Sequence, residues 1–188
     1  MRTNGRSRFL AALLALVMVI TLMPLSVFAA EAPAAISAQL VTDASELKSG
    51  DVILLTASKD GKMFTAGNFE SKYLKSIETT EETLGSDAVL FTLGGEKDAW
   101  TLTSEDGQMY TNAAKALNFS DKGVGTWKIS IEDGLATIAS TNSDFGRILY
   151  NVNTPRFMNY TSATNTSMLL PSIYKVSIEE NHVIESLD

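Results

Sequence analysis

The stretch from Arg147 to Tyr160, with the sequence RILYNVNTPRFMNY, holds the densest group of side chains that could bind a ligand. Tyrosine and phenylalanine rings offer apolar faces to a sugar or a peptide, while asparagine and arginine can hold its hydroxyl or carbonyl groups. The candidate ligand-binding residues are Arg147, Tyr150, Asn151, Arg156 and Tyr160. The alternative is that the rings belong to the core and the polar groups bind turn backbone. The sequence leaves both interpretations open.

The spacing within this stretch predicts a β-hairpin. Ile148, Tyr150 and Val152 occupy alternate positions, as on one face of a strand. Residues 153–155, Asn-Thr-Pro, are typical of a reversal, and residues 156–160 form the expected returning strand. Such a hairpin would gather the candidate residues into one small region.

Catalytic and metal-binding chemistry has little support elsewhere in the chain. His182 is the only histidine and lies near the chain end, where nothing holds it beside a nucleophile. The acidic Asp-Gly turns lack the alternating oxygen ligands of a calcium loop, and nothing indicates that their carboxylates converge as in a glycosidase. We therefore predict no catalytic residue, no metal site, no cofactor and no enzymatic activity for this segment.

The Asp-Gly turns predict hairpins instead. Asp-Gly between apolar runs is a strong hairpin signal, because both residues tolerate the positive φ that a tight reversal requires. The theme occurs three times, at Asp60-Gly61, Asp106-Gly107 and Asp133-Gly134. Trp100 and Trp127 each precede their turn by the same interval. Such a repeated Trp could stack on a sugar, but it more often fills a β core, and we favour the core.

Short strands separated by turns, with almost no helical periodicity, indicate an all-β fold. We expect a compact barrel of about ten to twelve short strands, resembling a β-trefoil. Asp43 and Glu46 have the spacing of a capping box, which predicts one short helical turn near the N-terminus of the domain. The closing strand is expected at about residues 169–178, after Pro171.

Residues 1–29 have the features of a secretory signal peptide. Three arginines precede an uncharged run from Phe9 to Phe28, and small residues surround Ala29. An uncleaved membrane anchor is the alternative, since about 20 apolar residues can span a bilayer, but Pro24 and the cleavage pattern favour removal. We expect a secreted, extracellular or cell-surface protein without a stable membrane anchor after cleavage.

The rest of the chain is expected to divide into three parts. Residues 30–38 are rich in alanine and predict a flexible leader, residues 39–178 a single β domain, and residues 179–188 a tail or the start of a linker. The chain contains no cysteine, so stability must come from burial rather than from disulfides.

The net charge of the chain limits the classes of partner that it is expected to bind. Residues 30–188 carry 12 Lys and Arg against 22 Asp and Glu, a formal net charge of −10. Nucleic-acid affinity depends largely on Lys and Arg that neutralise phosphates. We therefore expect no direct nucleic-acid partner. The ligand expected from the 147–160 stretch is a glycan or another cell-surface ligand.

The order of motifs from Gln39 to Val176 resembles a β-rich module of secreted and surface proteins of gut-type bacteria. The sharpest matches are Arg147, Leu149, Tyr150, Asn151, Arg156, Phe157, Tyr160 and Tyr174. That module often precedes an OB-like domain or an extracellular nuclease or phosphoesterase domain. The resemblance implies a non-catalytic accessory module, for binding or spacing, with a possible downstream domain in the same protein.

A second, weaker similarity is to ricin-type β-trefoil lectins. It is carried by the Trp-x-Leu and Trp-x-Ile patterns at Trp100 and Trp127. Those lectins have Gln two residues before the Trp, whereas this chain has Asp98 and Gly125 there. The similarity implies the alternative function of a free-standing glycan-binding protein.

Overall fold

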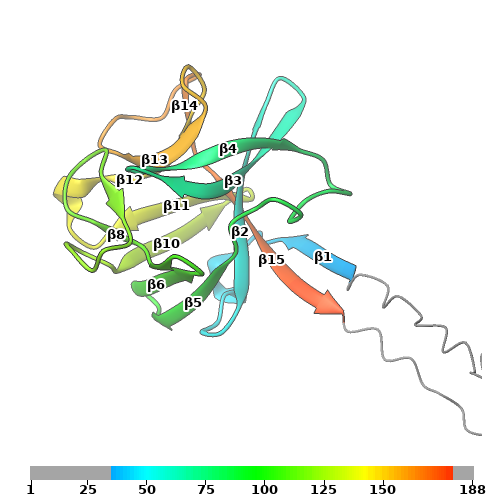
Figure 1. The fold of residues 1–188 in the computed structure, drawn as a ribbon, viewed down its shortest axis with the longest axis horizontal. Coiled ribbons are helices and arrows are strands. Elements are labelled where there is room, and N and C mark those ends of the chain that lie inside the picture. The colour runs from blue at the N-terminus through cyan, green and yellow to red at the C-terminus, as the bar shows by residue number, and fades with distance from the viewer. Residues whose placement is uncertain (1–34, 180–188) are drawn as a thin grey trace, which may run out of the picture. The chain divides into compact units, whose positions relative to one another are not determined.

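The computed structural model describes residues 35–179, which form an all-β fold with almost no helix (Figure 1). Within this range there are fifteen strands, and eleven have five residues or more, in agreement with the expected number. The all-β class is therefore confirmed. The predicted signal peptide and the end of the tail lie outside the described residues. No helix within residues 35–179 has the length and hydrophobicity that a membrane crossing requires.

The strands and two single turns of 3-10 helix follow one another along the chain. They are β1 (Ala35–Leu40), η1 (Ala44–Glu46), β2 (Val52–Lys59), β3 (Lys62–Glu70), β4 (Tyr73–Thr79), β5 (Phe91–Glu96), β6 (Ala99–Ser104), β7 (Gly107–Gln108), β8 (Tyr110–Thr111), β9 (Leu117–Asn118), β10 (Trp127–Glu132), β11 (Leu135–Ser140), η2 (Ser143–Phe145), β12 (Arg147–Asn151), β13 (Arg156–Tyr160), β14 (Met168–Leu169) and β15 (Ser172–Glu179).

Most strands belong to one antiparallel sheet whose pairings return to their starting point. The succession runs from β2 through β3, β4, β13, β12, β11, β10 and β6 to β5. β5 then pairs with β2 through Val52↔Thr92 and Ile53↔Phe91. We call these nine strands the strand ring. β15 pairs with β2 from outside this ring, and β1 pairs with β15.

The Asp-Gly hairpins are confirmed, because each turn joins two paired strands. Asp60-Gly61 joins β2 to β3, and Asp133-Gly134 joins β10 to β11. All four residues have positive φ, between 50° and 75°, as the sequence required. The third hairpin is shorter, since Gly107 is already the first residue of the two-residue strand β7.

The expected helical turn is present as η1, with its predicted capping box. The Asp43 carboxylate accepts a hydrogen bond from the Ser45 backbone N–H, and the Glu46 carboxylate accepts one from the Asp43 backbone N–H. These bonds satisfy donors that a helix start otherwise leaves open. η1 thus lies in the connection between β1 and β2, which both pair antiparallel with β15.

Both ends of the domain differ from expectation. β1 begins at Ala35, inside the segment predicted to be a flexible leader at 30–38, and it pairs with β15 as far as Ala35↔Glu179. Alanine-rich composition suggested flexibility, but a free edge on β15 supplies backbone hydrogen bonds whatever the side chains. The closing strand begins at Ser172, because Pro171 has no N–H to donate, and β14 forms separately against β12.

Candidate functional site

The predicted hairpin of residues 147–160 is present, but it lies in the core. β12 and β13 pair from Arg147↔Tyr160 to Asn151↔Arg156, with residues 152–155 as the reversal. Tyr150 and Tyr160 are each only 1% exposed, and Asn151 is 8% exposed. The rings therefore have no face available to a ligand in solvent.

Side chains of the hairpin pack against each other and form hydrogen bonds with each other. Tyr150 stacks on Phe64 at 5.4 Å and contacts Phe157 at 5.0 Å between ring centroids. The Tyr160 hydroxyl accepts hydrogen bonds from Asn151 Nδ2 and Arg156 Nε, each at 3.3 Å. Three of the five candidate residues are thus brought together, as a buried polar network rather than a ligand site.

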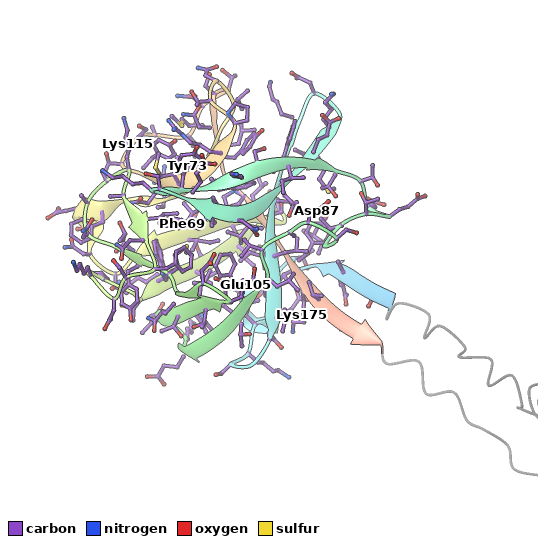
Figure 2. The ribbon with its side chains drawn as sticks, viewed as in Figure 1. Phe69, Tyr73, Asp87, Glu105, Lys115 and Lys175 are labelled. Carbon is purple, nitrogen blue, oxygen red and sulfur yellow. The ribbon has the colours of Figure 1, made fainter. Side chains whose placement is uncertain are left out.

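The two candidate arginines are half-buried. The Arg156 guanidinium lies 5.2 Å from the centroid of the Tyr73 ring, in the geometry of a cation–π contact, and Figure 2 labels Tyr73. Arg147 donates to the Ser162 carbonyl at 3.3 Å. Its Nε is the one buried side-chain polar atom without a hydrogen-bond partner within residues 35–179. Neither arginine lines one of the surface hollows described below.

Asn159, which the sequence analysis did not select, is the most heavily bonded side chain of the hairpin. Its amide nitrogen donates to Thr111 Oγ1 and to the carbonyls of Ala113 and Phe145, at 2.7 to 2.8 Å. Its oxygen accepts from the Ala116 backbone N–H at 3.0 Å. Asn159 is fully buried and ties two loops to β13. An asparagine among apolar residues, as in FMNY, was the available signal.

The best candidate binding site is a surface cleft of 550 Å³ with an apolar floor, which we call the Trp100 cleft. Its lining residues are Asp43, Ala44, Ser45, Leu47, Lys48, Ser49, Gly95, Glu96, Lys97, Trp100 and Ile129. Leu47, Trp100 and Ile129 are buried and supply the floor. Serine, lysine and carboxylate groups stand on the rim, which is the usual division of roles in small-molecule sites.

One wall of the cleft is η1 with the loop that follows it. Lys175, on β15, reaches this wall and donates to the Glu46 carbonyl at 2.8 Å. The same ammonium pairs with the Asp51 carboxylate at 2.8 Å, and that carboxylate also accepts from the Lys48 backbone N–H. Burial opposes ionisation of Asp51, but these hydrogen bonds outweigh it and lower the pKa of the carboxyl.

The opposite wall is the turn between β5 and β6. Gly95 has φ of +76°, and a Cβ there would lie 2.5 Å from the Ala99 carbonyl oxygen, so only glycine fits this tight approach. Lys97, in the same turn, also lines the cleft. Hydrogen bonds from Ser45 chiefly lower the pKa of the Asp43 carboxyl, and the charge of Lys97 lowers it further. Each wall therefore carries both signs of charge, with Asp43 and Lys48 on one and Glu96 and Lys97 on the other.

The two tryptophans have different environments although they are direct partners in neighbouring strands, Trp127↔Trp100. Trp127 is fully buried, and its indole Nε1 donates to the Met109 carbonyl at 3.2 Å. Trp100 is 6% exposed and lines the cleft. The core prediction is confirmed for both rings, with one edge of Trp100 left open.

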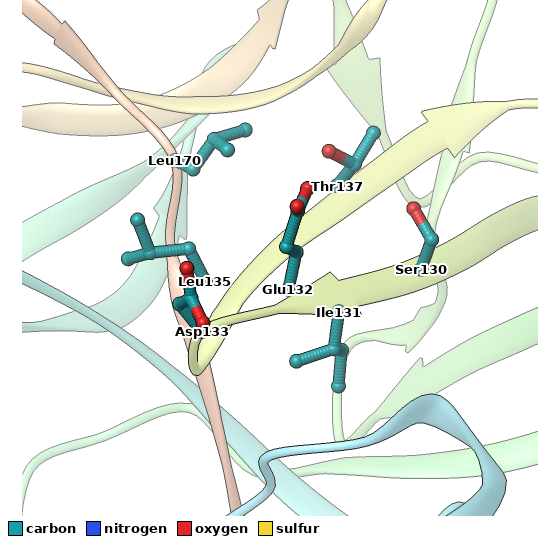
Figure 3. Close-up of a pocket in the computed structure, with 7 residues that line it drawn as sticks. All are labelled: Ser130, Ile131, Glu132, Asp133, Leu135, Thr137 and Leu170. Atoms are coloured by element: carbon teal, nitrogen blue, oxygen red, sulfur yellow. The ribbon is translucent and has the colours of Figure 1, made fainter.

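Two other hollows lack an aromatic floor. One of 440 Å³ is formed by the β10–β11 hairpin and Leu170, and Figure 3 shows Ser130, Glu132 and Thr137 projecting from one face of the hairpin. Another of 380 Å³ contains Asp87 and Glu105, which Figure 2 labels. No group of three or more His, Cys, Asp or Glu placed to hold a metal ion occurs in the described part of the chain.

Comparison with known proteins gives no family. No protein-family model matches the chain, and no curated protein matches its sequence. Among solved structures, a complex of lysenin with phosphocholine shows limited similarity, with a TM-score of 0.40 and 10% sequence identity over 75% of this chain. The matched part is 46% of that protein, so this chain spans less than half of its length. Such a likeness identifies neither family nor ligand.

Proposed function

We propose that the β domain is a non-catalytic binding module that holds a saccharide in the Trp100 cleft. The observation that carries the proposal is that Trp100, a ring that is 6% exposed, lines this cleft together with the apolar side chains of Leu47 and Ile129. An indole edge and aliphatic side chains suit the apolar face of a sugar ring, while hydroxyl, carboxylate and ammonium groups on the rim suit its hydroxyls. The cleft volume lies within the usual range for small-ligand sites.

The protein context proposed for this module is an exported bacterial protein, secreted or held at the cell surface. The antiparallel pairing of β1 and β15 supports attachment to other domains at one place, since Ala35 and Glu179 are direct partners. A downstream nuclease or phosphoesterase domain is the attachment that the module resemblance implies. A free-standing glycan-binding protein is the alternative, and both would use the same cleft.

The fold proposed for the domain is a β-barrel, with the strand ring as its wall. The β2–β5 pairing supports a barrel, because it joins the last strand of the succession back to the first. The support for a trefoil-like arrangement of this barrel is the occurrence of three Asp-Gly hairpins in the sequence.

A glycan array with matched tryptophan variants tests the function. We expect the wild-type chain to bind at least one glycan, and Trp100→Phe to weaken that binding about tenfold, because the cleft loses part of its aromatic lining. Trp127→Phe makes the same chemical change in the core and should leave glycan affinity unchanged in the folded protein. Binding that is equally strong in Trp100→Phe would place the site elsewhere. Absence of any signal from the wild-type chain would leave only the spacer function.

A further inference from the structure

β1 is the one long strand that pairs with a single strand among the described residues. Each strand of the strand ring pairs with at least two others over some part of its length, whereas β1 pairs only with β15. In an antiparallel pair, alternate residues direct their N–H and C=O groups away from the partner. Half of the residues of β1 therefore present unpaired backbone groups along its outer edge.

β1 lacks the features that usually protect such an edge. Its sequence, AISAQL, contains no charged residue and no proline. Its six pairs with β15 run in unbroken register, without a bulge. Natural edge strands are commonly protected by charge, proline or a bulge, and an unprotected edge is a template for another strand.

The β1–β15 ribbon also extends beyond its support. β15 pairs with β2 only from Ser172 to Val176, so the rest of β15 has β1 as its sole neighbour in the described chain. Figure 1 shows the two strands projecting side by side from the strand ring. An isolated two-stranded ribbon is marginally stable, and a third strand would strengthen it.

Apolar side chains gather where β1 meets the β10–β11 turn. Leu40 and Leu135 are the exposed large hydrophobic residues of the described chain, at 36% and 46%. Leu40 lies against this turn, since a Cβ at Gly134 would be 3.3 Å from Leu40 Cδ2. Leu135 also lines the 440 Å³ hollow beside Glu132 and Asp133 (Figure 3). The open edge therefore ends beside an apolar surface with an acidic margin.

We propose that the outer edge of β1 binds an extended peptide segment of another protein, by addition of a strand to the sheet. Backbone hydrogen bonds would supply the pairing, and apolar side chains of the peptide would cover Leu40 and Leu135. Lys or Arg at one end of the peptide would face Glu132 and Asp133. A second copy of this chain fits less well, because its own β1 carries no cation to meet these carboxylates.

The antiparallel pairing of the sheet predicts the chain direction of the bound peptide. Every strand pair in the domain is antiparallel, and an antiparallel partner of β1 has its N-terminal end beside Leu40. The basic residues should therefore stand at the N-terminal end of the bound segment.

The test uses the full chain and three capped synthetic peptides, KKVTVTVT, its reversed sequence TVTVTVKK, and EEVTVTVT. We expect KKVTVTVT to bind in calorimetry and to slow hydrogen exchange of the β1 amides. The reversed and acidic peptides should bind about tenfold more weakly, because they lose the charge pairing at the hollow. Equal binding of the three peptides, or no protection of β1, would overturn the proposal.

A matched pair of surface variants locates the site. Leu135→Lys should weaken binding of KKVTVTVT about tenfold, since it removes apolar contact and adds a like charge. Ser58→Lys places the same side chain at an exposed strand residue that lines none of the hollows, and should leave binding unchanged. Equal binding by both variants would contradict the site. Sedimentation must show a monomer without peptide, because a dimer that protects β1 would make the second copy the occupant and overturn the proposal.

Discussion

The 147–160 hairpin and the Trp100 cleft both combine aromatic and polar side chains, but the hairpin lies in the core and the cleft lies at the surface. The hairpin has more rings and more hydrogen-bonding tips, but β12 and β13 have paired neighbours on both sides and their side chains are largely buried. The cleft has one aromatic edge, left open between η1 and the β5–β6 turn. Side-chain type shows what a region could bind, and neighbouring elements decide whether a ligand can reach it.

The strongest test of this contrast is Tyr150→Ala. Loss of the ring removes its packing on Phe64 and Phe157, and we expect the free energy of unfolding to fall by about 3 to 5 kcal/mol. Urea unfolding measures this change. Thr154→Ala, at an exposed residue of the same hairpin, should change stability by less than about 0.5 kcal/mol. A Tyr150→Ala protein as stable as Thr154→Ala would mean that the hairpin is not core.

Asn159→Ala tests the polar part of the hairpin. The change leaves buried Thr111 and the backbone groups of two loops without their partner, and should lower the free energy of unfolding by about 3 kcal/mol. Hydrogen exchange should show the loop around Ala116 opening first. Asn153→Ala, at an exposed turn residue, is the control, and equal stability of the two variants would contradict the bonded role of Asn159.

Lys175→Met tests how the cleft wall is held. Loss of the ion pair with Asp51 and of the bond to the Glu46 carbonyl should lower the free energy of unfolding by about 1 to 2 kcal/mol. It should also weaken glycan binding, because the η1 wall loses its support. The matched control is Lys62→Met, which breaks a more exposed ion pair with Glu78 and should cost less than about 0.5 kcal/mol. Unchanged glycan binding in Lys175→Met would mean that the η1 wall does not contribute to the binding site.

Arg156→Ala should have a smaller effect. It removes the cation–π contact with Tyr73 and one hydrogen bond to Tyr160, worth together about 1 kcal/mol of stability. Glycan affinity should stay as in the wild type, because Arg156 does not line the Trp100 cleft. A glycan-array signal lost in Arg156→Ala but kept in Trp100→Phe would return the site to the hairpin.

The smallest expected effect is the acid dependence contributed by Asp51. Because its pKa is lowered in the folded state, its stabilising contribution is complete above the ordinary value of 3.8 and is lost as the pH falls through the folded-state pKa. Asp51→Asn should therefore be less stable than the wild type at neutral pH, and the difference should narrow as the pH falls below 3.8. Unfolding curves at neutral pH and at a series of pH values below 3.8 measure it, and a constant difference would exclude this role.

Local features of the fold were predictable from the sequence because neighbouring residues produce them. Asp133-Gly134 adopts the positive φ that its residue types favour, and the Asp43–Glu46 capping box closes over a few residues. The 147–160 hairpin follows from alternation on either side of a proline turn. Alternation could not show which face of that hairpin would be open, and in fact both faces are largely buried.

By itself the sequence determined the all-β class, the positions of the tight turns and the tryptophans as core residues. Only the tertiary structure decided that β2 meets β5, that β1 has an open edge, and that Trp100 rather than Tyr150 reaches a cleft. The physical reason is separation along the chain. A turn depends on adjacent backbone angles, whereas burial of a ring depends on strands that the sequence places far away and only folding brings into contact.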